Sequence, residues 1–266
     1  MQLRGDEVEK IHRLWDELAL FPSARTDEAL DHLIKTLCAW TGADNARWHA
    51  TVRLLRGKQV QEDGMCGWRL RTTRALLPRS PQQVKLSTGF NRVQKDFEVG
   101  VNVKALSLQA GRKFQVHRMR DGFIDFSAFR KTDYYKTYYQ DAGISDRMWI
   151  CFPMSADSES IIVFDRHGQS KNFTARQAAL AGEAWRGLRW FHQKLLLSHG
   201  LVVAQSPLSP GCRRVLQELL SGKSEKEIAA TLGQTPATTH QYVKAVLRHF
   251  SVSSRSSLMA LWLGSR

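Results

Sequence analysis

The stretch covering residues 208–263 constrains the fold most, because its sequence marks where several short helices begin and end. Ser224 and Glu227 form a predicted capping box, in which the serine hydroxyl accepts from the backbone three residues on and the glutamate accepts from the Ser224 N–H. Gly233 supplies a left-handed stop, and Pro236 follows at the first position of the next helix, where a missing N–H costs nothing. Two helices joined by so short a glycine-containing turn predict a helix-turn-helix.

Two further helices are predicted, one on each side of this pair. The first covers about 209–221 and ends at Gly222, and its apolar residues recur on one face at helical spacing. The last is capped by Ser254, and its predicted buried residues are Leu258, Leu261 and Leu263. The C-terminal part of the chain is therefore predicted to be an all-α domain of four short helices.

The third helix of this domain, capped by Thr235, has two distinct faces. Its predicted buried face recurs every three or four residues and consists of Thr239, Val243, Val246 and Phe250. The opposite, polar face consists of Ala237, Gln241, Lys244 and Arg248, with His240 beside them. No acidic residue occurs between Gly233 and Arg266, so this segment carries no carboxylate to repel phosphate. Because glutamine pairs with adenine and lysine donates to guanine, such a face is typical of a helix that reads the major groove.

Four motifs in this stretch together resemble the DNA-binding domain of LuxR-type (GerE-like) transcription regulators: L-S-P-G-C-R-R-V-L, G-K-S-E-K-E-I-A, L-G-Q-T-P-A-T-T and V-S-S-R-S-S-L. In that family, residues near the start of the third helix enter the major groove. The base contacts that the resemblance implies are His240, Gln241 and Lys244. The candidate phosphate contacts are Lys226, Arg248, and Thr235 and Thr238 in the N-terminal turn of the third helix. The sequence departs from the family pattern at Cys212, Thr239 and Tyr242, which leaves local packing and the operator sequence open.

The length of 266 residues predicts two domains, each large enough for its own core. The expected division is a GAF-like sensor and dimerisation domain at residues 1–200, a linker at 201–207 and the helix-turn-helix domain at 208–266. The net charge of +14 favours polyanions as partners, but the charge is spread over the whole chain. The basic composition therefore supports DNA binding without locating it.

The first 200 residues contain predicted elements in the order of a GAF-type sensor domain. These are helices at 6–20 and 26–40, a hairpin of strands at 46–55 and 68–76, a loop with irregular helix at 78–111, a short strand at 113–119, a helix at 132–140, strands at 147–154 and 160–165, and a long helix from Thr174 to about Gly200. The run F-P-M-S-A-D-S-E-S-I-I-V-F-D-R, followed by F-T-A-R-Q, resembles sensor domains attached to LuxR-type regulators. The resemblance implies an α+β, GAF/PAS-like domain: an antiparallel sheet with helices packed on one face and a pocket on the other.

The sequence contains no catalytic constellation, since it lacks both a nucleophile elbow and a G-x-G-x-x-G after a strand. The chain is therefore predicted not to be an enzyme, and neither a cofactor nor a metal site is predicted. The histidines are scattered, and the four cysteines, at positions 38, 66, 151 and 212, are expected to be reduced thiols. With no signal peptide and no apolar run long enough to span a membrane, the chain is predicted to be cytoplasmic.

The tryptophans allow two interpretations. Either Trp40, Trp48, Trp68, Trp149 and Trp185 line an aromatic ligand pocket, or they belong to the core, which their helix and strand spacing favours. No ligand-binding residue is assigned on this basis. An acyl-homoserine-lactone-type quorum-sensing regulator stays open as an alternative, although its tryptophan–tyrosine–aspartate pocket has only a loose similarity here, at residues 133–135 and Tyr138.

The sequence as a whole predicts a bacterial, sequence-specific DNA-binding transcription regulator. One small helical module buries too little area to bind tightly, which favours a homodimer on double-stranded DNA with a two-fold operator. A small-molecule effector and RNA polymerase are further candidate partners, and no membrane partner is expected. The long helix at 174–197 is either the element that passes ligand or dimerisation state to the DNA-binding domain or a core helix of the sensor. A second alternative is a ligand-binding sensor whose helical tail docks a protein.

Overall fold

The computed structural model describes residues 2–78, 81–92, 99–168, 171–201 and 206–264. The described chain divides into two compact units, formed by Met1–Arg13 with His32–Arg189 and by Leu14–Asp31 with Trp190–Arg266. The second unit therefore includes residues 190–200, which the sequence analysis assigned to the sensor domain. The predicted linker at 201–207 falls largely on residues 202–205, outside the described residues, and the functional boundary stays a prediction.

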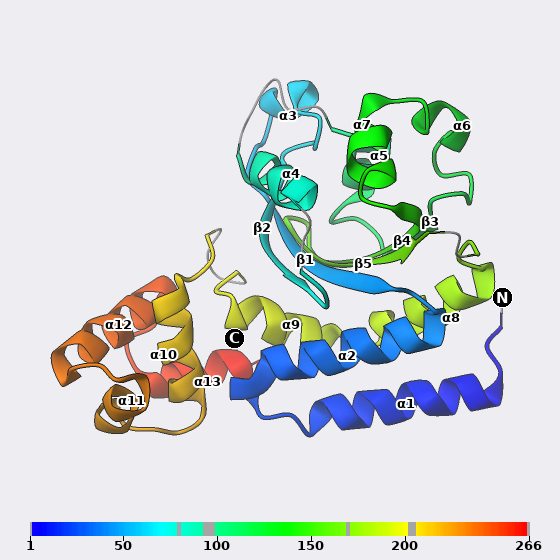
Figure 1. Cartoon of the computed structure of the whole chain (residues 1–266). Coiled ribbons are helices and arrows are strands. Elements are labelled where there is room, and N and C mark those ends of the chain that lie inside the picture. Colours follow the sequence, from blue (N-terminus) through cyan, green and yellow to red (C-terminus); the bar gives the residue numbers. More distant parts are fainter. Residues whose placement is uncertain (1, 79–80, 93–98, 169–170, 202–205, 265–266) are drawn as a thin grey trace. The chain divides into compact units, whose positions relative to one another are not determined.

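The first unit is built on an antiparallel sheet, which has five strands among the described residues (Figure 1). The strands are β1 (Asn45–Arg53), β2 (Trp68–Ala75), β3 (Gln115–Arg118), β4 (Ile144–Ser155) and β5 (Ser158–His167). Their order across the sheet is β2-β1-β5-β4-β3, and each neighbouring pair is antiparallel. This arrangement confirms the predicted α+β fold with an antiparallel sheet and the predicted hairpin pairing of the first two strands.

The two faces of the sheet differ in polarity because side chains alternate along each strand. On β1, Ala46, Trp48 and Ala50 are fully buried on one face. Arg47 and His49 point to the other face, where the cross-strand partners of His49 and Thr51 are Ile161 and Glu159. One face is therefore apolar, and the other carries charged and polar groups.

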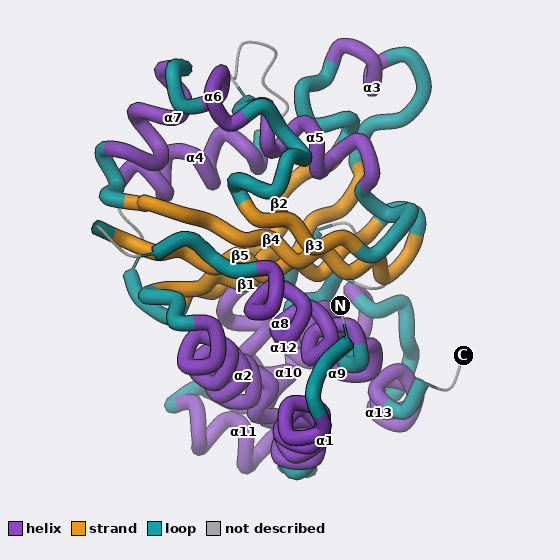
Figure 2. Tube along the Cα trace, turned by 90° about the vertical axis from the view of Figure 1, so that its right-hand side faces the viewer, coloured by secondary structure: helices purple, strands orange, loops and turns teal. Residues whose placement is uncertain are grey.

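Helices cover both faces of the sheet (Figure 2). The apolar face packs against α8 (Ala175–Arg186), where Gly182 lets the helix approach Val116 closely: an added Cβ would lie 2.9 Å from a valine methyl. The predicted capping box of Thr174 and Gln177 is present at the start of α8. The carbonyl of Thr41, at the end of α2 (Thr26–Thr41), accepts from the Gln177 side chain at 2.8 Å and thereby joins the two helices.

The predicted single helix from Thr174 to about Gly200 is wrong, because the chain forms two helices there. The first, α8, ends at Gly187, and α9 runs from Arg189 to Ser198. The Gly187 N–H already closes a tight turn onto the carbonyls of Glu183 and Trp185. Glycine is a poor residue for a helix interior, and the break falls on it.

The polar face of the sheet is covered by α4 (Pro81–Asn91) and α5 (Val101–Gln109), as Figure 2 shows. The sequence analysis expected a loop with irregular helix over 78–111, and the described part of this segment forms two regular helices; residues 79–80 and 93–98 lie outside the described residues. The helices had no clear apolar stripe because they face a polar surface. Asn102 and Ser107, for example, are among their buried residues.

Short helical segments complete the first unit. They are α3 (Gln59–Glu62), α6 (Phe126–Phe129), α7 (Asp133–Tyr135) and a single π-helical turn, η2 (Lys136–Gln140). The predicted helix at 132–140 thus forms as α7 and η2, with Thr132 as its N-cap.

The second unit contains the predicted helical domain. Its helices are α10 (Pro210–Leu220), α11 (Glu225–Leu232), α12 (Pro236–His249) and α13 (Arg255–Trp262). The unit also takes in the C-terminal part of α1 (Gly5–Ala19), the short 3-10 turn η1 (Ser23–Arg25) and most of α9. Its core contains Leu197, Val215, Leu216, Leu219, Ile228, Val246, Phe250 and Leu258. The predicted all-α domain of four short helices is confirmed for residues 206–264.

Two predicted core positions are wrong. Leu263 is 81 % exposed because α13 ends at Trp262, which packs its ring against Phe250 with the centroids 5.6 Å apart. On α1, the spacing of apolar residues in the sequence predicts that Val8 shares the buried face of Ile11 and Leu18, but Val8 is exposed, whereas Ile11, Leu14 and Leu18 are buried. Within the described residues, no helix is both long and apolar enough to cross a membrane.

Candidate functional site

The helix α12 presents the two faces that its sequence predicts. Thr239, Val246 and Phe250 are fully buried, and Val243 is nearly so. The exposed residues are Ala237, Thr238, His240, Gln241, Lys244 and Arg248. The buried face fixes the helix in the domain core, and the polar face is thereby left accessible to a partner.

Local interactions set the direction of α12. Gly233 ends α11 in the left-handed conformation, with φ of 61°, which glycine adopts at no steric cost. The Thr235 hydroxyl then accepts from the Thr238 N–H at 3.1 Å and caps the new helix. On the side of α10, Gly211 allows the ring of Tyr242 to come close, since a Cβ there would lie 2.9 Å from a ring carbon. Gly233 thus permits the turn between α11 and α12, and Gly211 permits the close packing of α10 against α12.

The sequence-predicted DNA-binding residues are all exposed in the structure. Lys226 lies in the first turn of α11, and the others lie in the first turn or along the polar face of α12. Gln241, Lys244 and Arg248 follow at intervals of three and four residues, so their side chains share one stripe of the helix. The fold thus leaves all of the predicted contact residues accessible to a partner.

One carboxylate reaches this face from outside the segment that lacks acids. Glu225 of α11 lies 3.0 Å from Nδ1 of His240, and both side chains are about half exposed, at 42 % and 48 %. The sequence window from Gly233 onwards could not reveal this pair, because Glu225 belongs to the preceding helix. His240, a predicted base contact, is thus paired with a carboxylate of its own domain in this structure.

Hydrogen bonds join α10 and α12 to residues that precede α10 in the chain. Nε2 of His249, the last residue of α12, lies 2.9 Å from the Gly200 carbonyl oxygen. Arg213 of α10 donates to the Ser198 carbonyl at 2.9 Å and to the Asp27 carboxylate at 2.5 Å. All of these residues belong to the second unit, so α10 and α12 are joined by hydrogen bonds to the end of α9 and the residues that follow it.

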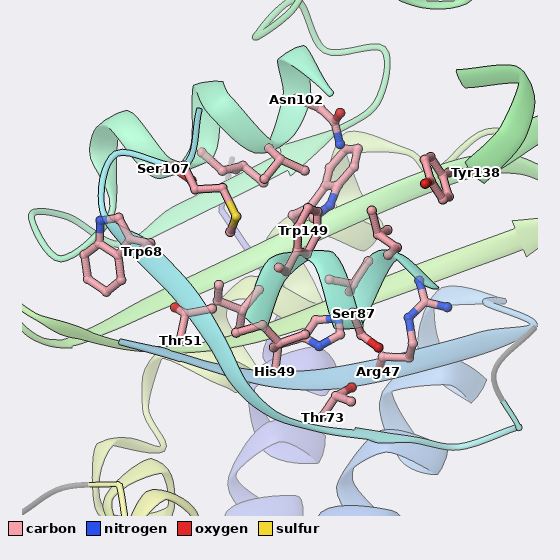
Figure 3. A pocket seen from close by; sticks show the side chains of 18 of the residues that line it. Arg47, His49, Thr51, Trp68, Thr73, Ser87, Asn102, Ser107, Tyr138 and Trp149 are labelled. Atoms are coloured by element: carbon pink, nitrogen blue, oxygen red, sulfur yellow. The ribbon is translucent and has the colours of Figure 1, made fainter. Parts of the chain in front are cut away.

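The first unit contains a cavity of about 140 Å³ between the polar face of its sheet and the helices α4 and α5 (Figure 3). Aromatic rings line much of it, from Trp68, Phe90, Tyr134, Tyr138, Tyr139 and Trp149. Aliphatic side chains such as Leu86 and Val103 contribute further apolar wall. The polar lining includes Arg47, His49 and Thr51, which follow one another along the pocket face of β1. Mostly apolar walls with a few convergent polar groups are typical of small-molecule sites.

A buried ionic cluster stands at one end of this pocket. The Asp165 carboxylate accepts from Nε and Nη2 of Arg147, at 2.5 and 3.1 Å, and from Nη2 of Arg47 at 2.7 Å. Burial by itself would raise the pKa of Asp165, but the charges of Arg147 and Arg47 outweigh it and lower the pKa to about 2. The aspartate is therefore ionised at any physiological pH. Burial lowers the pKa of Arg47, but a guanidinium beside a carboxylate stays protonated.

A chain of polar contacts runs from this cluster along the pocket wall. The Arg147 guanidinium lies 4.4 Å from the centre of the Tyr139 ring. The Tyr139 hydroxyl in turn accepts from Nδ2 of Asn102 at 2.8 Å. Burial raises the pKa of Tyr139, so the phenol stays protonated. These contacts link β4, η2 and α5 around the cavity.

Glu159 lies on the pocket face of β5 and is 2 % exposed. Its carboxylate accepts from the Gly111 N–H at 2.9 Å. Burial raises the pKa of Glu159 to about 7, against the opposing influence of that N–H and of the Arg53 charge. Gly111 needs its φ of +73° here, and a Cβ would lie 2.5 Å from the Ala156 carbonyl oxygen.

The sequence analysis did not assign this pocket. Of the tryptophans, Trp48 and Trp185 are fully buried core residues, whereas Trp68 and Trp149 line the cavity, so both interpretations hold for different residues. Tyr138, at the point of loose similarity to lactone sensors, also lines it. The available signal was the alternation of polar and apolar residues in N-A-R-W-H-A-T-V-R, which puts the polar residues on one face of the predicted strand.

No group of three or more metal-ligating side chains is found in the part of the chain that the structure describes. Cys38, Cys66, Cys151 and Cys212 are free cysteines in the structure.

Comparison with known families identifies the C-terminal helices. Residues 206–262 match the family model of bacterial regulatory proteins, luxR family. These helices form a luxR-family domain. The match confirms the resemblance drawn from the four motifs, and it covers α10 to α13 in full.

Solved structures similar to the whole chain or to its first part are distant in sequence. One is SdiA in complex with octanoyl-rac-glycerol, with 12% identity and a TM-score of 0.48, over 100% of this chain and 97% of that one. Another is SdiA of Escherichia coli, with 12% identity and a TM-score of 0.44, over 97% and 98%. The LBD domain of VqsR from Pseudomonas aeruginosa has 15% identity and a TM-score of 0.46, over 73% of this chain and 97% of that chain. A search of curated proteins gave no match.

Proposed function

We propose that the chain is a transcription regulator whose luxR-family domain reads a DNA half-site through α12 and whose first unit binds a small-molecule effector. The observation that carries the proposal is the geometry of α12. One face is locked into the domain core, and the opposite face exposes Gln241, Lys244 and Arg248. A positive, amide-bearing helix face of this kind suits the major groove.

The proposed contacts divide into two classes. His240, Gln241 and Lys244 contact base edges, and His240 first has to exchange its Glu225 partner for DNA. The phosphate contacts come from Lys226, Arg248, Thr235 and Thr238. Of these, Thr235 and Thr238 lie at the N-terminus of α12, where the helix dipole and the unpaired N–H groups favour an anion.

The regulator is proposed to act as a homodimer in the cytoplasm, to have no catalytic activity of its own and to contact RNA polymerase as a further partner. A single small helical domain buries too little surface for tight DNA binding, and two copies on a two-fold operator remove this limit. Light scattering of the full-length protein, alone and with DNA, measures its oligomeric state.

The route from the effector to DNA is proposed to run through α8 and α9. Gly187 joins the two helices, and the residues that follow α9 hold the DNA-binding helices through Gly200 and His249. A pocket lined by tyrosines and tryptophans supports the effector half of the proposal and keeps a quorum-sensing function as the second candidate.

The test is DNA binding by the full-length protein and two variants, measured by fluorescence anisotropy over a salt series. Gln241→Ala should weaken binding to the operator by about tenfold or more while leaving random DNA unaffected. Arg248→Ala should weaken all sequences alike and reduce the slope of log K against log salt by about 0.9. The matched control, Arg130→Ala, removes the same charge from an exposed position of the first unit and should leave the slope unchanged.

The operator itself is found by sequencing the genomic fragments that the wild-type protein retains. If the wild-type protein does not bind double-stranded DNA even at low salt, the proposed function is refuted. The alternative, a sensor whose helical tail docks a protein, would then be favoured. If the two variants lose affinity equally on operator and random DNA, the assigned roles of Gln241 and Arg248 are wrong.

A further inference from the structure

We infer that the pocket of the first unit binds a small organic anion, a carboxylate on an aromatic body, whose charged end is received by Arg47. The inference rests on the proposed function, which assigns an effector to this pocket. It goes further in naming the charge and the chemical class of that effector.

The first argument is the charge of the buried cluster. Arg47 and Arg147 contribute two positive charges, and the Asp165 carboxylate that both of them contact contributes one negative charge. The three side chains are each at most 7 % exposed, so water does little to screen the remaining positive charge. A buried charge is costly unless an opposite charge pairs with it, and an anionic ligand supplies that pair.

The second argument is the way in which Asp165 is shared. Arg147 occupies both carboxylate oxygens, whereas Arg47 reaches the carboxylate through Nη2. Nη1 of Arg47 is buried on the pocket lining and has no hydrogen-bond partner among the described residues. A ligand carboxylate is the acceptor that a guanidinium N–H binds most strongly.

The third argument concerns the ligand body. Tyr134, Tyr138 and Trp149 supply aromatic wall, and rings stack or pack edge-on against such a wall. Oδ1 of Asn102 is buried beside them without a donor in the part of the chain that is described. The ligand body is therefore expected to carry an N–H or O–H group as well.

Glu159 does not cancel the positive charge of the cluster. It lines the same pocket, but burial raises its pKa to about 7, so at slightly acidic pH the carboxyl is mostly neutral. Binding is therefore best compared at pH 6.5, where an ordinary carboxylate ligand is still ionised.

The experiment is calorimetric titration of the full-length protein with indole-3-acetate and with indole-3-acetamide at pH 6.5. The two probes have the same ring N–H and nearly the same shape, and they differ in charge. Phenylacetate and phenylacetamide form a second, smaller pair. The acid of at least one pair should bind about tenfold more tightly than its amide, as expected for one charge-assisted hydrogen bond to a buried partner.

The matched variants are Arg47→Met and Arg47→Lys. Arg47→Met should reduce the preference for the acid to less than about twofold, and Arg47→Lys should keep part of it because the charge remains. Asp165 keeps both bonds from Arg147 in either variant, so the fold is expected to survive, which a thermal melt verifies. Because the comparison of acid with amide on the wild-type protein needs no variant, the inference stays testable if a variant unfolds.

Each outcome has a distinct meaning. Amides that bind as tightly as their acids overturn the anionic class but leave the pocket as an effector site. If neither acid binds, the inference is also overturned. The DNA-binding part of the proposed function is tested separately, by the anisotropy measurements on the full-length protein. If Arg47→Met still binds the acid more tightly than the amide, another cationic group binds the carboxylate, and the role of Arg47 is refuted.

Discussion

Glu159→Gln is expected to stabilise the protein, and increasingly so as the pH rises. A carboxyl whose pKa is higher in the folded state than in the unfolded chain binds its proton more tightly when folded. The stability associated with that proton is fully present below the unfolded pKa and is lost as the pH rises through the folded pKa. For Glu159, the loss therefore falls between pH 4.5 and about 7. Glutamine keeps an oxygen for the Gly111 N–H and never ionises.

The size of the effect follows from the two pKa values. The difference between 4.5 and about 7 corresponds to roughly 3 kcal/mol of destabilisation when the buried carboxyl is fully ionised. Between pH 5.5 and 8.5, the difference in unfolding free energy between variant and wild type should thus grow by about 2 kcal/mol in favour of the variant. Because both proteins are compared at the same pH, the contributions of all other titrating groups cancel.

Urea denaturation followed by tryptophan fluorescence at pH 5.5, 7.0 and 8.5 measures this difference. Glu159→Asp serves as a control, since it keeps the charge while shortening the side chain, and it should not gain stability at high pH. If the difference in unfolding free energy between wild type and Glu159→Gln is constant across the three pH values, the pKa of Glu159 is the same in the folded and unfolded states. The account of its burial would then be wrong.

Three further substitutions test the packing. Phe250→Ala removes a fully buried ring and should cost about 3–5 kcal/mol in urea denaturation, with loss of DNA binding; a smaller cost than 1 kcal/mol would place the ring outside the core. Ser224→Ala removes the capping box of α11 and should lower stability by about 1 kcal/mol, whereas an unchanged midpoint would mean that the cap contributes nothing. Gly111→Ala should destabilise by more than about 1 kcal/mol, because φ is +73° and the added Cβ meets the Ala156 oxygen. Gly222→Ala, with positive φ but nothing within 4 Å, should cost less, and the reverse order would contradict the steric argument.

The C-terminal helices were predictable because their signals are local. A cap, a stop and a first-turn proline each act on backbone groups within a few residues of their own position, and each of Ser224, Gly233 and Pro236 plays its expected role. The buried face of α12 followed from spacing alone. These local rules could not predict the contact between Glu225 of α11 and His240 of α12, because it joins two different helices.

The pocket was not predictable for the opposite reason. Arg47, Arg147 and Asp165 lie on three strands, and only their register brings them together. In sequence, an arginine on a strand indicates a solvent-facing side chain, and nothing local shows that helices will cover it. The same covering explains why α4 and α5 had no apolar stripe: their inner positions face polar groups, so periodicity could not reveal them.

The ties of Arg213 to Asp27 and Ser198, and of His249 to Gly200, limit how freely the luxR-family domain can be moved to another protein. A chimaera that transplants residues 206–264 onto a foreign sensor would leave these partners behind, along with Leu197 from the domain core. Such a graft would have a partly buried guanidinium without its carboxylate, and its core would lack the Leu197 side chain. Transplanting from Trp190 onwards would restore Leu197, Ser198 and Gly200, but Asp27, the carboxylate partner of Arg213, would still have to be supplied.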